Sequence, residues 1–150
     1  QLKVMKEAGI KISFDFSDDS SKEYYEKYAP YITYAFCSFD GDDEAAKEHL
    51  KFIHSLGPEL VSLTRGSKGS IMYDGEQIYT QPATLIDNVV DTMGAGDSFL
   101  TSFMDCYIDQ LKRGTDRQEA IRTSLKEASK FAAHVCTLNG AFGYGKPYED

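Results

Sequence analysis

The hydrophobic pattern between residues 31 and 64 constrains the fold more than any other feature, because its period changes twice. A short apolar run, YITYAF at 31–36, precedes a segment at 42–57 in which apolar residues recur about every 3.6 positions, as in an amphipathic helix. Gly57-Pro58 is a typical helix end, and the apolar run ELVSLT at 59–64 indicates another strand. A strand, a helix and a strand in succession predict a parallel sheet with a right-handed crossover.

The segments on either side extend the same sheet. IKISFDF at 10–16 alternates apolar and polar residues as a strand does, and LKVMKEAG at 2–9 indicates the end of a helix before it. The segment 17–30 that follows is polar and stands where a helix is expected in the series strand, helix, strand, helix, strand from residue 10 to residue 64. In SIMYDGEQIYT at 70–80, Asp74-Gly75 separates two apolar runs and predicts a hairpin, which adds an antiparallel edge. Because the chain opens inside a helix–strand unit, we expect it to be a fragment.

Two amphipathic helices are expected near the carboxyl end. The segment 99–114 carries a broad apolar face, and 116–135 begins with a capping-box-like Asp116 and Glu119. Residues 138–150 contain three glycines and a proline and indicate a loop with a tail. No internal repeat, low-complexity tract or linker interrupts the sequence, so we expect one α/β unit.

Charge and hydropathy argue against two classes of partner. The 150 residues carry a net charge of −8, and the 16 Lys and Arg are scattered, unlike the basic stripe of a nucleic-acid-binding protein. No apolar run approaches the roughly 20 residues that cross a bilayer, and the first residues do not resemble a signal peptide. We therefore expect a cytoplasmic protein without nucleic-acid or membrane partners.

The cysteines and histidines do not indicate a metal site or a disulfide framework. Three cysteines are an odd number and lie far apart, so buried thiols are expected. The histidines lack convergent ligands at metal spacing, so structural or surface roles are expected. These residues are Cys37, Cys106 and Cys136, and His49, His54 and His134.

The glycine-rich stretch DTMGAGDSF at 91–99 precedes a predicted helix. Glycines permit positive φ and close approach, so successive N–H groups and the positive end of the helix dipole form an anion site suited to phosphate. Asp97 would repel a bound phosphate, but it could accept a proton from a hydroxyl while the amides stabilise the phosphoryl group. That arrangement indicates a phosphotransferase. The alternative is that Asp97 only caps the helix.

DTMGAGDSF resembles the Asp-Thr-x-Gly-Ala-Gly-Asp-x-Phe signature of the ribokinase-like, or PfkB, carbohydrate kinases. The resemblance extends over essentially the whole chain: FDFS at 14–17 fits a strand ending in Asp, TRGSKG at 64–69 fits a Thr-x-Gly-x-x-Gly turn, and 131–141 fits a final helix and glycine loop. It implies a three-layer α/β/α sandwich with a mostly parallel sheet and an antiparallel hairpin edge. This chain would be the C-terminal, nucleotide-binding part, and the N-terminal half with its lid would be absent.

The resemblance implies roles for the residues of the glycine turn. Asp97 would be the catalytic base that deprotonates a sugar hydroxyl. The γ-phosphate would lie in an anion hole formed by the backbone amides of Gly94, Ala95, Gly96 and Asp97. Many members also bind a monovalent cation, K⁺, which here would involve Asp91 and Met93 with the segment 138–140.

The resemblance also implies that ATP, entering with Mg²⁺, contacts the TRGSKG turn. The residues concerned are Thr64, Arg65, Gly66, Ser67, Lys68 and Gly69. Considered without the family, two glycines after a strand allow a ligand to approach the backbone, and a simple turn entering a hairpin is an equal alternative.

One family feature is missing from the sequence. Many members carry Asn-x-x-Glu on a strand-to-helix loop, where the Glu places Mg²⁺ through water, but this chain has CSFDGDDEAAK at 37–47. Asp40, Asp43 or Glu44 could replace that Glu, because Mg²⁺ takes few carboxylates together with water and phosphate oxygens. A solvated acidic helix start is an equal alternative.

The leading hypothesis is ATP-dependent phosphorylation of a hydroxyl on a sugar or a sugar–amine adduct. Within the family, the run VVDTMGAGDSF resembles most the members that act on fructosyl-amine substrates. A nucleoside or vitamin kinase of the same fold is the second hypothesis, and a catalytically incomplete nucleotide-binding or oligomer-forming module is the third. A homodimer of the full-length protein stays open. We expect the isolated chain to phosphorylate sugars poorly, because acceptor positioning supplies much of the rate.

Overall fold

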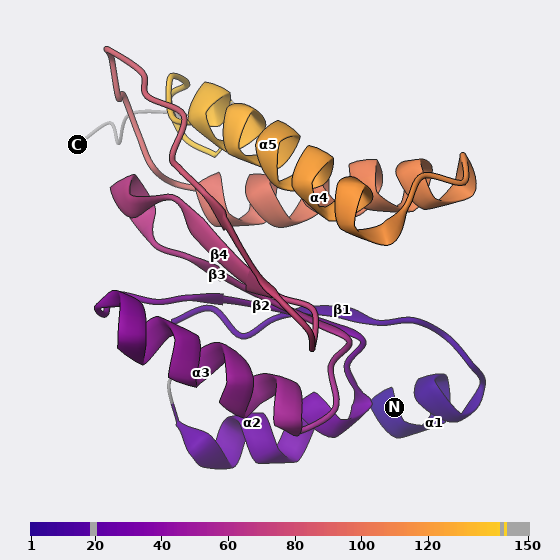
Figure 1. The fold of residues 1–150 in the computed structure, drawn as a ribbon. Helices are drawn as coiled ribbons and strands as arrows, with labels where there is room; N and C mark the ends of the chain where they lie inside the picture. The colour runs from indigo at the N-terminus through magenta and orange to yellow at the C-terminus, as the bar shows by residue number, and fades with distance from the viewer. Residues whose placement is uncertain (19–20, 142, 144–150) are drawn as a thin grey trace. The chain divides into compact units, whose positions relative to one another are not determined.

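The computed structural model describes residues 1–18, 21–141 and 143 (Figure 1). Its contacts divide the chain into two compact units, one of Gln1–Gly66 with Ser70–Thr80 and the other of Ser67–Gly69 with Gln81–Asp150. The predicted loop and tail at 138–150 lie outside the described residues from 144 onward and at residue 142.

The first unit is built on a sheet with strand order β1-β2-β3-β4-β5. Strands β1 and β2 are parallel, as are β2 and β3, whereas β3 and β4 are antiparallel. The parallel sheet with an antiparallel hairpin edge was predicted and is confirmed. The elements of the chain up to Gln81 are α1 (Leu2–Glu7), β1 (Ser13–Asp15), α2 (Lys22–Tyr28), the 3-10 turn η1 (Ala29–Tyr31), β2 (Tyr34–Ser38), α3 (Asp43–Ser55), β3 (Leu60–Thr64), the 3-10 turn η2 (Gly66–Lys68), β4 (Ser70–Tyr73) and β5 (Ile78–Gln81).

Helices α2 and α3 lie on the same face of this sheet (Figure 1). Their buried side chains form one hydrophobic core with alternate residues of β2 and β3, because successive side chains of a strand point to opposite faces. The core residues of these elements are Tyr25, Ala46, Leu50 and Ile53 on the helices and Ala35, Cys37, Val61 and Leu63 on the strands.

The polar segment 17–30 forms more structure than its composition indicates. It contains α2, whose Tyr25 is 1% exposed, and it ends in η1, whose Ala29 is fully buried. Tyrosine buries a large ring despite its hydroxyl group, so the helix is amphipathic through Tyr24, Tyr25 and Tyr28. The expected strand at 31–36 consequently begins later, at Tyr34, because the chain up to Tyr31 continues the helical turns.

The second unit contains two antiparallel helices, α4 (Ala95–Lys112) and α5 (Arg117–Val135), which pack along each other. The side chain of Asp116 caps α5 by accepting hydrogen bonds from the amides of Gln118 and Glu119, as predicted. α4 begins at Ala95, earlier than the expected residue 99, so the glycine turn is part of the helix start. The buried core residues are Phe99, Phe103, Tyr107, Ala120, Ile121, Leu125, Ala128, Ala133 and Val135.

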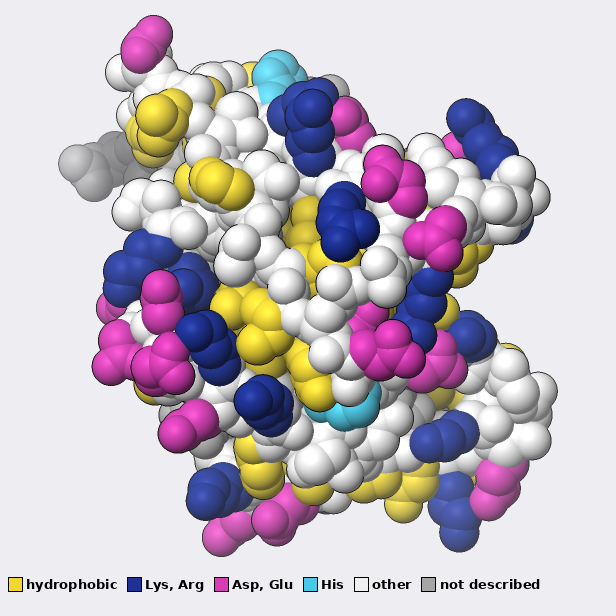
Figure 2. Space-filling model, in the orientation of Figure 1, with side chains coloured by type: hydrophobic (Ala, Val, Ile, Leu, Met, Phe, Trp, Pro, Cys, Tyr) yellow, Lys and Arg dark blue, Asp and Glu magenta, His cyan; other side chains and the backbone are white. Residues whose placement is uncertain are grey.

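Charge on the surface is mixed rather than concentrated. Lys and Arg side chains alternate with Asp and Glu over the face drawn in Figure 2. Among the described residues, none of the helices has the length and apolar character that a membrane span requires.

Candidate functional site

The glycine turn at the start of α4 depends on Gly94 for two reasons. Gly94 is the N-cap residue and has φ of 76°, in the left-handed region where an L side chain is strained. A Cβ atom built on Gly94 would also lie 2.8 Å from Cβ of Ala141 and 3.1 Å from its Cα. The turn therefore packs against the backbone near residue 141, as only glycine allows.

Three amide groups of this turn have no acceptor among the described residues. The N–H of Ala95 donates to the carbonyl of Thr92 at 3.2 Å, and the helical ladder begins with Ser98 N–H donating to Gly94 at 2.9 Å. The N–H groups of Gly94, Gly96 and Asp97 form no hydrogen bond with any described residue. Free N–H groups at the positive end of a helix dipole favour an anion. Of the four N–H groups predicted to form the anion hole, only that of Ala95 donates a hydrogen bond to another described residue, Thr92.

Asp97 lies in the first turn of α4 and its side chain is exposed. The carboxylate forms no hydrogen bond or ion pair with the part of the chain that the structure describes. The N-cap position belongs to Gly94, and no described side chain caps this helix. Asp97 therefore does not cap the helix through a hydrogen bond, although it lies as an acidic residue in the first turn, and its oxygen atoms are open to a ligand.

Asp91 connects the glycine turn to the loop after α5. Its Oδ1 accepts a hydrogen bond from Met93 N–H at 3.0 Å, and its Oδ2 accepts one from Gly140 N–H at 3.1 Å. Its own amide donates to the carbonyl of Cys136 at 3.2 Å. The structure thus joins Asp91 to the loop expected beside the cation, while Met93 is 64% exposed. The K⁺ site at Asp91 and Met93 stays a prediction.

The TRGSKG turn leaves β3 and enters the hairpin at β4. Gly66 and Gly69 have φ of 54° and 88°, and a Cβ on Gly69 would collide with Gln81 O and lie 2.6 Å from Ala83 N. Ser67 and Lys68 are exposed. The glycines are therefore required by the turn itself, which is the alternative weighed from the sequence, and nucleotide contact by this turn stays a prediction.

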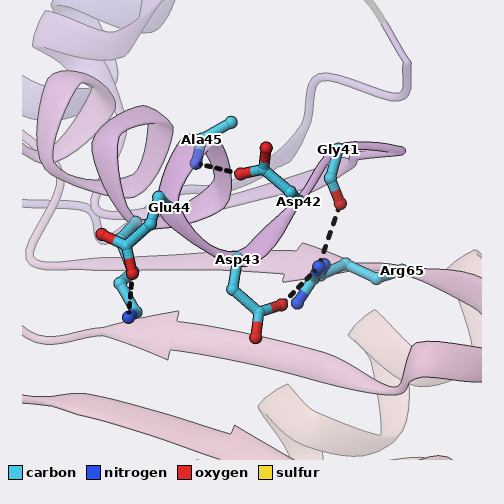
Figure 3. Close-up of polar contacts among 7 residues, drawn as sticks. Gly41, Asp42, Asp43, Glu44, Ala45 and Arg65 are labelled. Carbon is cyan, nitrogen blue, oxygen red and sulfur yellow. Dashed lines mark hydrogen bonds and ion pairs between the residues drawn. The ribbon is translucent and has the colours of Figure 1, made fainter.

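Thr64 and Arg65 link the end of β3 to the loop after β2. The hydroxyl of Thr64 lies 3.4 Å from both Ser38 Oγ and Cys37 O. Arg65 donates through Nη2 to the carbonyl of Gly41 at 3.0 Å and pairs with Asp43 Oδ1 at 2.8 Å (Figure 3). The sequence did not indicate this ion pair.

The acidic loop, residues 40–44 after β2 with the first residues of α3, contains three carboxylates that contact other groups of the protein (Figure 3). Asp42 caps α3 by accepting from Ala45 N–H at 2.8 Å, and Glu44 pairs with Lys47 at 2.7 Å. Asp43 is paired with Arg65, so two of the three candidate Mg²⁺ carboxylates, Asp43 and Glu44, already contact cationic side chains. Among the described residues, no cluster of three or more His, Cys, Asp or Glu could hold a metal ion. The described residues of this segment therefore form no preassembled three-ligand metal site.

The cysteines and histidines have environments consistent with structural roles. Cys37 is buried as expected, and burial raises its pKa to about 12, whereas Cys106 and Cys136 are only partly buried. His49 is half-buried, with Nε2 at 3.2 Å from the Tyr25 hydroxyl, and burial lowers its pKa. His54 lies edge-on to a tyrosine ring, and His134 is exposed.

Comparison with curated proteins finds relatives that are sugar kinases. The chain is 37% identical over 140 residues to "Fructosamine kinase FrlD" of Bacillus subtilis (strain 168), covering 93% of this chain and 46% of that protein. It is 39% identical over 97 residues to "Fructoselysine 6-kinase" of Shigella flexneri, covering 65% of this chain and 37% of that protein. The chain thus spans less than half the length of these relatives.

Comparison with solved structures finds the same fold. The ribokinase of Giardia lamblia matches with a TM-score of 0.79 and 20% identity, covering 93% of this chain and 50% of that one. Aminoimidazole riboside kinase of Salmonella enterica, solved with aminoimidazole riboside and an ATP analog, matches with a TM-score of 0.72 and 22% identity, covering 94% and 50%. The predicted ribokinase-like α/β fold is confirmed.

A family model described as "pfkB family carbohydrate kinase" matches residues 2–143, which include the glycine turn, the TRGSKG turn and every described helix and strand. This chain belongs to the PfkB family of carbohydrate kinases.

Proposed function

We propose that this chain is the nucleotide-binding, C-terminal part of an ATP-dependent kinase that phosphorylates a hydroxyl of a sugar or a sugar–amine adduct. One observation carries the proposal: the start of α4 combines amides at Gly94, Gly96 and Asp97 that are free among the described residues with an exposed carboxylate on Asp97. An anion site and a base on one helical turn suit phosphoryl transfer, which depends on charge stabilisation and positioning.

In the proposed reaction, the Asp97 carboxylate accepts the proton of the acceptor hydroxyl as its oxygen attacks the γ-phosphorus of ATP. The new P–O bond forms as the bond to the β-phosphate oxygen breaks, and ADP leaves. The free N–H groups stabilise charge on the transferred phosphoryl group. Ala95 contributes by holding the turn through its bond to Thr92, rather than by donating to the phosphate.

The nucleotide would lie against Thr64–Gly69, where Gly66 has open space beside its backbone. Membership of a kinase family implies ATP, and Mg²⁺ bound to the phosphates would neutralise part of their charge. Because Asp43 and Glu44 are paired, we derive no step through a metal held by the acidic loop.

A fructosyl-amine is the acceptor that the curated relatives favour. Both the fructosamine kinase and the fructoselysine 6-kinase share more than a third of the aligned residues with this chain. A nucleoside acceptor is the second candidate, because a cytidine kinase of Thermococcus kodakarensis is 29% identical over 85% of the chain. Initial rates of the full-length enzyme with fructoselysine, fructose, ribose and cytidine distinguish the two.

The Asp97→Asn variant of the full-length kinase tests the base. We expect ATP affinity to stay within about twofold and kcat to fall roughly 10²–10⁴-fold, the usual contribution of a general base. Asp105→Asn is the matched control, because Asp105 is also an exposed carboxylate of α4. Normal turnover by Asp97→Asn would refute the base assignment, and ATP binding without turnover in the unmodified enzyme would favour the non-catalytic alternative.

A further inference from the structure

Arg65 lies just after β3, at an edge of the sheet that the loop after β2 also leaves. Ser38, the last residue of β2, pairs with Thr64, the last residue of β3, and the two strands are parallel. The loop after β2 and the turn after β3 therefore leave the same carboxyl edge of the sheet, where ligands bind in open α/β folds. Arg65 is the first residue beyond that edge on β3.

The contacts of Arg65 run to the neighbouring loop. Its Nη2 donates to Gly41 O at 3.0 Å and forms an ion pair with Asp43 Oδ1 at 2.8 Å, which ties the start of α3 to the start of the TRGSKG turn. Phe39 N–H donates to Thr64 O at 2.9 Å and adds a second link between the same two loops. These contacts fix where the turn begins.

The environment of the pair is asymmetric. The Arg65 side chain is 8% exposed, and its buried Nε has no partner among the described residues, whereas the Asp43 side chain is 76% exposed. A guanidinium withdrawn from water depends on the few acceptors that it contacts. Loss of the Asp43 charge therefore leaves a largely buried cation whose remaining described acceptor is the neutral carbonyl of Gly41, while Asp43 itself is solvated with or without Arg65.

We infer that Arg65 is a positioning residue: with Asp43 and Gly41, it fixes the start of the TRGSKG turn, residues 64–66, so that the backbone there is preorganised for the nucleotide. This inference rests on the proposed kinase function. It gives Arg65 an indirect role, because its Nη2 contacts acceptors of the protein. It also gives the acidic residue Asp43 a role other than metal binding. Affinity for the nucleotide would then depend on an ion pair that joins two loops.

Glu44 provides the matched control. It belongs to the same first turn of α3 as Asp43 and forms an ion pair of similar length, 2.7 Å, with Lys47. Lys47 lies on the same helix, and both side chains are substantially exposed, so this pair joins no second loop. Both acidic residues interact with the same helix N-terminus, so Asp43→Asn and Glu44→Gln remove comparable charges and differ in the link to Arg65.

The test measures KM for ATP, kcat and thermal midpoint for Asp43→Asn, Glu44→Gln and Arg65→Lys in the full-length kinase. We expect Asp43→Asn to raise KM for ATP about tenfold, the equivalent of roughly 1.4 kcal/mol, with kcat within about twofold. Arg65→Lys should raise KM as well, because one ammonium does not reproduce the planar fork of arginine. Glu44→Gln should leave KM unchanged.

A change in thermal midpoint without a change in KM for Asp43→Asn would overturn the inference, as would an equal rise in KM for Glu44→Gln. Asp43 is exposed, so its variant decides the matter even if Arg65→Lys fails to fold. If the unmodified enzyme neither binds ATP nor turns over, the proposed kinase function itself is refuted. Normal activity of that enzyme together with an unaffected Asp43→Asn rejects the positioning role alone.

Discussion

Replacement of Gly94 by alanine tests the geometry of the glycine turn. At φ of 76° an alanine costs about 1–2 kcal/mol relative to glycine, because its Cβ crowds the following carbonyl. That Cβ would also lie 2.8 Å from Cβ of Ala141, and an overlap of this kind adds about 1–3 kcal/mol when the neighbours shift only partly. Gly94→Ala should therefore lower the free energy of unfolding by about 2–5 kcal/mol in total.

Two other glycines separate these contributions. Gly114 has φ of 82°, but no described atom lies within 4 Å of the position that a Cβ would take there, so Gly114→Ala should cost only about 1–2 kcal/mol of conformational strain. Gly96 lies in the first turn of α4 with negative φ and open space, so Gly96→Ala should stabilise the helix by up to about 1 kcal/mol. Its methyl group would nevertheless stand beside the free amides that we propose hold phosphate.

Urea unfolding of the three variants, followed by circular dichroism, gives the free energies, and steady-state kinetics of the full-length kinase give the activity. The expected order, from most to least stable, is Gly96→Ala, Gly114→Ala and then Gly94→Ala, while kcat/KM should fall for Gly96→Ala although it is stable. If Gly94→Ala costs no more than Gly114→Ala, the close approach to Ala141 is refuted.

Two further predictions concern buried titratable groups. The lowered pKa of His49 means that protonation opposes folding: its contribution to stability is present above about pH 6.5, the unfolded pKa, and is lost as pH falls through the folded pKa. His49→Gln should flatten stability against pH below about 6.5, as urea titrations between pH 5 and 8 would show; an unchanged slope would contradict this. Cys37, with its pKa raised to about 12, should react with a thiol reagent at pH 8 only upon unfolding, and after the partly buried Cys106 and Cys136; labelling followed by peptide mass analysis decides.

The elements that the sequence predicted best have strong local signals. The hairpin at Asp74-Gly75, the cap at Asp116 and the helix ended near Gly57 each depend on residues within a few positions of one another. The helix within 17–30 was only implied by the alternation of strands and helices, because its apolar surface comes from tyrosines, whose burial depends on the sheet they pack against. Helix α2 is therefore stabilised by tertiary contacts that its polar composition conceals.

The candidate site likewise contains one feature that the sequence predicts and one that it does not. The turn at 91–99 could be predicted because glycine conformation and the free amides of a helix start are local properties. The hydrogen bond from Ala95 N–H to Thr92 could not be predicted, because it depends on where α4 begins. That boundary was expected at residue 99 but lies at Ala95. A helix start displaced by one turn changes which N–H groups are free, although the motif itself is unchanged.

The ion pair between Arg65 and Asp43 shows what additional information a sequence would need. The two residues are far apart along the chain, and each alone is an ordinary charge, one after a strand and one in the first turn of a helix. Parallel register makes them neighbours, because β2 and β3 end together at Ser38 and Thr64. Given that register, residues shortly after each strand lie at one edge, and an arginine there meets the acidic start of α3. Opposite charges that follow adjacent parallel strands therefore predict a pairing as well as a ligand site, and the two must be weighed before acidic residues are assigned to a metal.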